Sequence, residues 1–180
     1  MTTKYLLFNS SIDTRTANLL SSAIVDCINA DGIDDITIGI CSSGGNVTEG
    51  VGLHHVIRSC PKPITIHAFG NIESIAVTVF LGARIRRAVA STHFLFHSVG
   101  VTLDQRADVR FLAEKLEALK VDELRLGQLW LSHVKLENSE LAALFDSEQT
   151  HDCEWALAHG FVHQICDFSI PPGAPVANVY

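Results

Sequence analysis

Residues 70–76 read GNIESIA and connect an apolar segment, residues 64–68, to a second apolar segment, residues 74–83. The first segment is predicted to be a buried strand that ends in a glycine-containing turn, and the second to be a helix. Ser74 then stands at the start of this helix, where the helix dipole favours negative charge. A serine in this place is a candidate nucleophile, although a serine that only caps the helix would occupy the same position.

Two further segments supply the other groups that an acyl-transfer site requires. Residues 41–50 read CSSGGNVTEG, in which a strand end is predicted to open through Gly44 and Gly45 into a helix. Backbone N–H groups in such a turn, together with that of Ile75, can point at a developing oxyanion, although glycines also serve ordinary turns. Downstream, a short apolar strand is predicted to end at His97, a candidate general base.

These three segments resemble those of the proteolytic subunit of the Clp protease (ClpP), a serine peptidase of the ClpP/crotonase fold. ICSSGGNVTEG is similar to the family's oxyanion segment, GNIESIA to its nucleophile turn and FLFHSVG to its histidine strand. They occur in the family's order and at nearly its spacing. FNSSID, near the first strand, and WALAHGFVHQI, near the last helix, extend the resemblance over nearly the whole chain.

The resemblance implies an α/β fold of the ClpP/crotonase type, a spiral of β/α units with a long handle helix. It also implies a Ser-His-Asp triad of Ser74, His97 and an acid in the loop before the last helix. Asp146 is favoured as that acid, while Asp152 is better explained as a helix N-cap. An asparagine or a backbone carbonyl could replace the acid, because its role is to orient the histidine.

The activity implied is that of a serine endopeptidase, a hydrolase that cleaves peptides or unfolded proteins by acyl transfer inside an oligomeric chamber. This chemistry requires no cofactor. One alternative is a crotonase-like acyl-CoA enzyme, which uses an oxyanion hole without a serine. Another is a silent subunit or scaffold, which is favoured by three departures from the family pattern, Ser43 for proline, Glu73 for a small residue, and Ser98. An inward carboxylate at Glu73 would oppose the growing negative charge, whereas an outward one could bind a subunit or a substrate amine.

Composition sets the broad class. The chain has 180 residues, 47% of them hydrophobic, which suits a single domain over residues 1–180. Its 13 basic and 20 acidic residues give a net charge of −7, so nucleic acid is not an expected partner. The longest apolar run, Ile75 to Leu81, is too short to cross a membrane.

Cysteine and histidine placement bears on location and metals. The five cysteines are odd in number and scattered, which indicates reduced thiols in a cytoplasmic protein. The nine histidines include close pairs, but none comes with a matching third ligand, so no metal is predicted.

Apolar periodicity predicts alternating strands and helices around a parallel-rich sheet. The predicted strands cover residues 5–8, 36–41, 64–68, 85–89 and 94–97. The predicted helices cover residues 14–30, about 49–58, 74–83, 106–134, about 138–145 and 153–159, with an extended tail at 171–180.

The long helix at 106–134 carries the prediction of assembly. Its 29 residues would reach roughly 43 Å, which exceeds what one domain of this size needs. Val109, Leu112, Leu116 and Leu119 recur on one face and are predicted to contact another subunit. We therefore expect a homo-oligomeric ring of six or seven subunits, possibly stacked through this handle. An ATPase unfoldase partner is not expected, because only four residues precede the first predicted strand.

Overall fold

The computed structural model of the protein describes residues 2–103 and 106–180, so Met1, expected ahead of the first strand, lies outside the described residues. The strands are β1 (Thr3–Asn9), β2 (Asp35–Ser42), β3 (Ile64–Glu73), β4 (Ile85–Ala88), β5 (His93–Phe96), β6 (Gln149–Asp152), β7 (Gln164–Ile165) and β8 (Val176–Asn178). The helices are α1 (Thr14–Asn29), α2 (Val47–Ser59), α3 (Ile75–Leu81), α4 (Val109–Leu131), α5 (Asn138–Asp146) and α6 (Cys153–Ala158).

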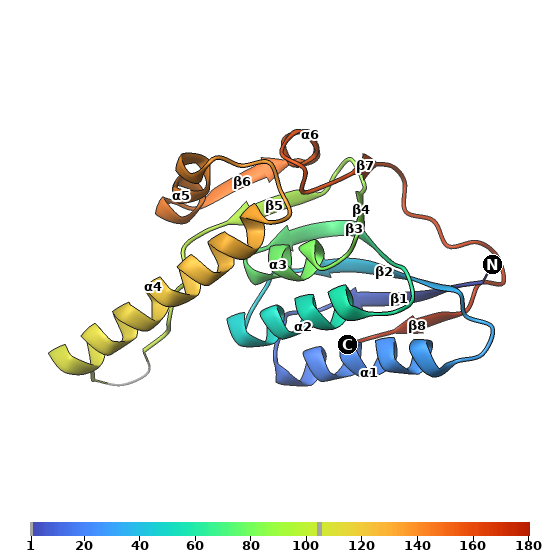
Figure 1. Ribbon diagram of the computed structural model, residues 1–180, viewed down its shortest axis with the longest axis horizontal. Coiled ribbons are helices and arrows are strands. Elements are labelled where there is room, and N and C mark those ends of the chain that lie inside the picture. The colour runs from blue at the N-terminus through green and yellow to red at the C-terminus, as the bar shows by residue number, and fades with distance from the viewer. Residues whose placement is uncertain (1, 104–105) are drawn as a thin grey trace.

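One sheet organises the chain and confirms the predicted α/β class. Its strands run in the order β6-β5-β3-β2-β1-β8, and β4 pairs with both β3 and β7. All pairs are parallel except β5 with β6, which is antiparallel. The central strands are strongly apolar because helices cover them, as Figure 1 shows for α1, α2 and α3.

The predicted amphipathic face of α1 is the face that packs on the sheet. Leu20, Ile24 and Cys27 are buried. Asp13 caps the helix in a reciprocal capping box with Thr16, which satisfies backbone N–H groups at the N-terminus. The turn-forming residues before the helix thus position α1 against the sheet.

Strand β3 is longer than predicted, and the expected turn around Gly70 is wrong. The strand continues to Glu73 because Ile72 and Glu73 pair with Phe94 and Leu95 of β5. The β2–β3 register also shifts between Ile40 and Ser42, which aligns Ser42 with Ile72. The sharp change of direction therefore falls at Ser74 itself.

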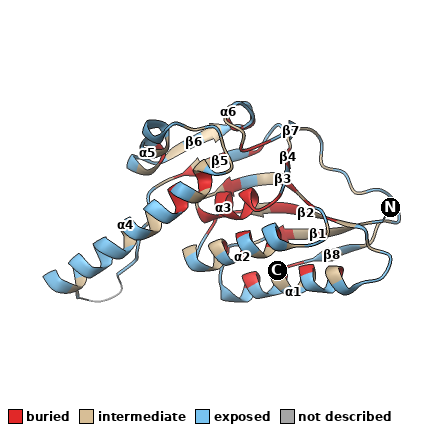
Figure 2. Ribbon diagram, in the orientation of Figure 1, coloured by how far each residue is buried: buried red, intermediate tan, exposed pale blue. Residues whose placement is uncertain are grey.

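The long helix is shorter than the predicted 106–134 and is anchored only at its C-terminal end. Its buried residues are Leu126, Gly127 and Trp130. The Trp130 indole N–H donates to the Thr78 hydroxyl of α3 at 2.9 Å. The N-terminal part of α4 projects from the body of the protein and is largely exposed (Figures 1 and 2).

The buried guanidinium of Arg86 joins segments that are far apart in the chain, because it donates hydrogen bonds to several of their backbone carbonyls. Arg86 is almost fully buried, and it donates to the carbonyls of Phe161 at 2.7 Å, Gly160 at 2.8 Å and Ala83 at 3.0 Å. Burial lowers the pKa of Arg86 to about 10, so it remains charged at neutral pH. It also donates to the carbonyl of His133, whose own pKa is lowered to about 4, chiefly by burial.

The C-terminal third contains three short strands that apolar periodicity does not predict. Strand β6 is short and polar, reading QTHD, and it pairs with β5. The extended tail contributes β8, which pairs with β1. Asp152 accepts a hydrogen bond from the Trp155 N–H at 2.9 Å, which confirms its prediction as the N-cap of α6. Among the described helices, none is long and apolar enough to cross a membrane.

Candidate active site

Ser74 lies in a strained turn between β3 and α3. Its φ of 55° and ψ of −129° make it the only non-glycine residue with a positive φ in residues 2–103 and 106–180. The backbone is held there by the Ser74 N–H, which donates to the Leu95 carbonyl at 2.8 Å, and by a fully buried α3. Ser74 is the N-cap residue of α3 by position, but its side chain makes no capping hydrogen bond, so the hydroxyl is not engaged as a cap. Strain of this kind is characteristic of functional sites.

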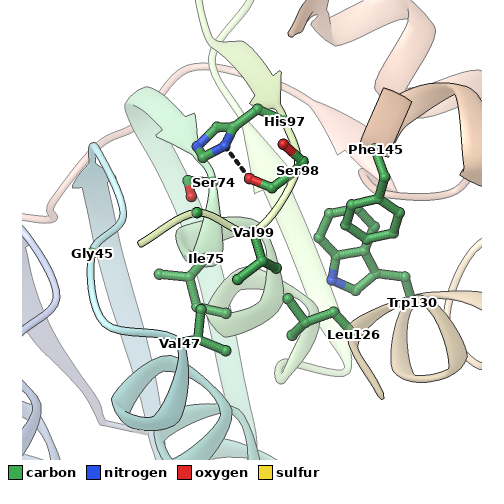
Figure 3. Close-up of a pocket in the computed structure, with 11 residues that line it drawn as sticks. Gly45, Val47, Ser74, Ile75, His97, Ser98, Val99, Leu126, Trp130 and Phe145 are labelled. Atoms are coloured by element: carbon green, nitrogen blue, oxygen red, sulfur yellow. Dashed lines mark hydrogen bonds between the residues drawn. The ribbon is translucent and has the colours of Figure 1, made fainter. Parts of the chain in front are cut away.

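His97 lies beside Ser74 at the end of β5 (Figure 3). Its Nδ1 is 2.6 Å from the Ser98 carbonyl oxygen. A carbonyl can only accept, so Nδ1 carries the proton and Nε2 of the neutral ring is free to accept one. Within the described part of the chain no hydrogen bond joins the Ser74 hydroxyl to His97, a bond that in ligand-free sites is often long or misaligned.

Both residues open onto one mainly apolar pocket of about 140 Å³. An apolar cavity of roughly this size can hold a benzene ring, so the pocket suits a single apolar side chain. Its wall comes from several elements, as Figure 3 shows, and comprises Val47, Ile75, Val99, Leu126, Trp130 and Phe145. Sequence reasoning did not identify this wall, and the only signal was the i, i+4 spacing of Leu126 and Trp130.

The two glycines are wedged between backbone segments. A Cβ atom at Gly44 would lie 2.7 Å from both the Glu73 carbonyl oxygen and Ser74 Cβ, and one at Gly45 would lie 2.2 Å from the Ile12 carbonyl oxygen. Both glycines also have positive φ, so no other residue fits here without strain. The Gly44 N–H donates to the Ser42 hydroxyl at 3.2 Å, whereas Gly45 lines the pocket together with Ser74 and Ile75.

The structure does not place Asp146 in the pocket that contains His97. Asp146 is the exposed last residue of α5 and lines a different groove along α4. The β5–β6 pairing points to another carboxylate. The ladder ends at the pair of Phe96 with Gln149, and one further antiparallel step, beyond the paired residues, would bring His97 opposite Glu148. Sequence reasoning missed Glu148 because it did not predict β6.

The Glu73 side chain points away from the pocket at Ser74. Its carboxylate accepts a hydrogen bond from Asn71 Nδ2 at 3.1 Å. Glu73 lines a separate, open pocket, together with Ser43, and is absent from the lining of the pocket at Ser74. Among the described residues, no three His, Cys, Asp or Glu side chains come together as a metal site.

The structure is that of an α/β protein in which Ser74, at a strand-to-helix turn, lines one pocket with His97. The family model of the Clp protease matches residues 1–169, and the chain belongs to that family. It is 25% identical over 165 residues to the ATP-dependent Clp protease proteolytic subunit 1 of Mycobacterium leprae, covering 90% of this chain and 81% of the relative. It is 22% identical over 169 residues to the proteolytic subunit 2 of Thermobifida fusca, covering 90% and 80%.

The fold is also that of a known ClpP structure. A point mutant of ClpP1 from Listeria monocytogenes superposes with a TM-score of 0.79 at 20% sequence identity, covering 91% of each chain. This match confirms the predicted ClpP-like fold class, including its mixed α/β sheet.

The strain at Ser74 leads to a stability prediction. Ser74→Gly should be more stable than Ser74→Ala by about 1 kcal/mol, because only glycine adopts this backbone conformation without strain. Urea unfolding of the two variants measures the difference. Exposed Ser22 within α1 is the matched control, where glycine should be the less stable replacement by a similar amount. Equal stability of the two Ser74 variants would mean that the turn is not strained.

Proposed function

We propose that the protein is an active serine endopeptidase of the ClpP type that cleaves peptides or unfolded proteins. The single observation that carries the proposal is the strained Ser74, free of any capping bond, in one pocket with His97. Family membership supports peptidase chemistry, since the curated relatives are named as proteolytic subunits. The reaction would need no cofactor.

The proposed reaction is acyl transfer through Ser74. His97 Nε2 accepts the Ser74 proton while the alkoxide attacks the peptide carbonyl, and the proton then passes to the departing amine. The N–H groups of Gly45 and Ile75 hold the oxyanion, because the Gly44 N–H is already bonded to Ser42. Water then releases the acyl group by the same steps in reverse order.

The apolar pocket suggests which bonds are cut. It would receive an apolar side chain next to the scissile bond, since six apolar side chains line it and its volume fits one such group. Burial of that side chain in the pocket would also hold the carbonyl carbon of the scissile bond near Ser74.

Labelling with a fluorophosphonate tests this proposal. The probe should react with Ser74 and with no other serine, and Ser74→Ala should abolish both labelling and hydrolysis of short unfolded peptides that contain leucine. The assay contains no ATPase. Ser22→Ala, at an exposed position on α1, is the matched control and should label normally. An unlabelled Ser74 would favour a silent subunit or a crotonase-like acyl-CoA enzyme instead.

The group that orients His97 is proposed to be a carboxylate that supplements the Ser98 carbonyl. Glu148 is the first candidate because one further step of the β5–β6 register would bring it opposite His97, and Asp146 is the second. Either carboxylate would keep the proton on Nδ1 and stabilise the imidazolium that forms during the reaction.

Three variants separate the candidates. Glu148→Gln should lower kcat at least tenfold, more than Asp146→Asn does, because a neutral amide cannot stabilise the imidazolium. Asp152→Asn is the control and should change mainly stability, by about 1 kcal/mol or less, because asparagine also caps helices. Steady-state kinetics and urea unfolding provide the readouts. A larger loss of kcat in Asp146→Asn would return the role to Asp146.

The projecting part of α4 supports a proposed homo-oligomeric ring of six or seven subunits, possibly stacked. Val109 is 85% exposed and Leu116 is 52% exposed, although both are apolar. The ion pairs Arg110–Glu114 and Glu117–Lys120 lie along the same helix and would keep its other faces in water. Partner subunits would cover the apolar side chains.

Light scattering should give several times the mass of one chain at micromolar concentration. Leu116→Lys should reduce that mass, because a lysine opposes burial of this face. Val25→Lys is the matched control, since Val25 is 49% exposed on α1, and it should leave the mass unchanged. A monomeric wild-type protein would contradict the proposal.

We also propose a cytoplasmic location. The described cysteines are all free thiols, as expected in a reducing compartment. Unfolded peptides would be the principal partners, and the acidic net charge of −7 argues against nucleic acid.

A further inference from the structure

A second pocket is lined by Glu73, the residue that directly precedes the proposed nucleophile Ser74. Glu73 precedes Ser74, yet the two side chains line different pockets. Ser74 faces the apolar pocket with His97, while Glu73 lines an open hollow of about 490 Å³, called the polar pocket here because most of the residues that line it are of polar type. A peptide bound across Ser74 would therefore have an apolar pocket and a polar one within reach.

The polar pocket is formed where three parallel strands end. Its lining comes from β1 and the loop after it, from the end of β2 and the loop after it, and from β3, and comprises Asn9, Ser10, Ser11, Cys41, Ser42, Ser43, Gly70, Asn71 and Glu73. No lysine or arginine lines it, and Glu73 is its only carboxylate. The serine hydroxyls and asparagine amides of the lining can both donate and accept hydrogen bonds, so Glu73 supplies the one charged group among these lining residues.

Glu73 has no cationic partner in the described part of the chain. The only polar contact that its carboxylate makes there is the hydrogen bond from the neutral Asn71 amide at 3.1 Å. The negative charge is therefore uncompensated, and it is held in place by that bond. A group that carries both positive charge and several N–H donors matches such a site, as a guanidinium or an ammonium does. A single carboxylate does not suit a divalent cation, which prefers several charged oxygen ligands.

We propose that Glu73 and the polar pocket bind a lysine or arginine side chain of the peptide substrate, close to the bond that is cut. The proposal rests on the proposed peptidase function, because Ser74 defines where that bond lies. Successive residues of an extended peptide are at most about 3.6 Å apart, so a side chain one or two residues away reaches the neighbouring pocket. Substrates would then combine an apolar residue with a nearby basic one.

Binding to the Ser74→Ala variant tests the site without requiring turnover. The probes are fluorescein-labelled peptides of seven residues that contain one leucine and one arginine, with the arginine moved stepwise from two residues before the leucine to two after it. In the matched peptides citrulline replaces arginine, which keeps the shape and removes the charge. Fluorescence anisotropy should show about tenfold tighter binding of the arginine peptide at one or two positions.

Substitutions of Glu73 should remove this preference. In the Ser74→Ala background, Glu73→Gln should bind arginine and citrulline peptides equally, and Glu73→Lys should instead prefer a peptide with glutamate at that position. Glu154→Gln removes the same charge from an exposed site on α6 and should keep the tenfold preference. With Ser74 intact, the ratio of kcat/KM for the arginine and citrulline peptides should fall from about tenfold to one in Glu73→Gln.

The outcomes separate this proposal from the peptidase assignment. Charge-dependent binding without cleavage or Ser74 labelling would support the cation site and overturn the proposed function. Cleavage with equal use of arginine and citrulline peptides, or no binding of either peptide, would overturn the cation site. A change of mass in light scattering for Glu73→Gln would show that the carboxylate contacts another subunit, which would also overturn it.

Discussion

The close contact between the Gly44–Gly45 turn and the backbone on both sides of it is the constraint on which the site depends. The turn lies between the Ile12 backbone and the Ser74 turn, with no room for a Cβ atom on either glycine. Backbone hydrogen bonds fasten it there, since the Ile12 N–H donates to the Gly44 carbonyl at 2.7 Å. The end of β2 is therefore held against the end of β3, and Gly45 is set in the pocket of Ser74.

Helix α3 connects this site to the projecting helix. Its Thr78 hydroxyl accepts the Trp130 indole N–H, and its Thr78 carbonyl accepts a hydrogen bond from buried His54 of α2. Trp130 in turn stacks on Phe145, with ring centroids 5.2 Å apart, and both line the apolar pocket. A subunit that packs on α4 would therefore contact a helix whose residues form part of the pocket wall. The proposed assembly and the proposed substrate binding would share this physical connection.

Much of the fold is predictable because its strands are buried and its helices amphipathic. The face of α1 that carries Leu20, Ile24 and Cys27 follows directly from spacing. The extension of β3 beyond Ala68 does not, because Gly70 resembles a turn signal and only pairing with β5 makes Ile72 part of a strand. Strand β6 is likewise not predictable, since its four polar residues are stabilised by β5 rather than by their own pattern.

The sequence by itself determined which residue types stand where the strands end, and so it indicated Ser74, His97 and the two glycines. Only the tertiary structure decided how those groups are used, because each choice depends on contacts between segments far apart in the chain. The Ser42 hydroxyl accepts a hydrogen bond from the Gly44 N–H, whereas Gly45 lines the pocket. The Ser98 carbonyl accepts from His97 Nδ1 and so sets the His97 tautomer. The direction of the Glu73 carboxylate and the antiparallel pairing of β6 with β5 follow from local hydrogen bonds and strand pairing, which residue spacing does not encode.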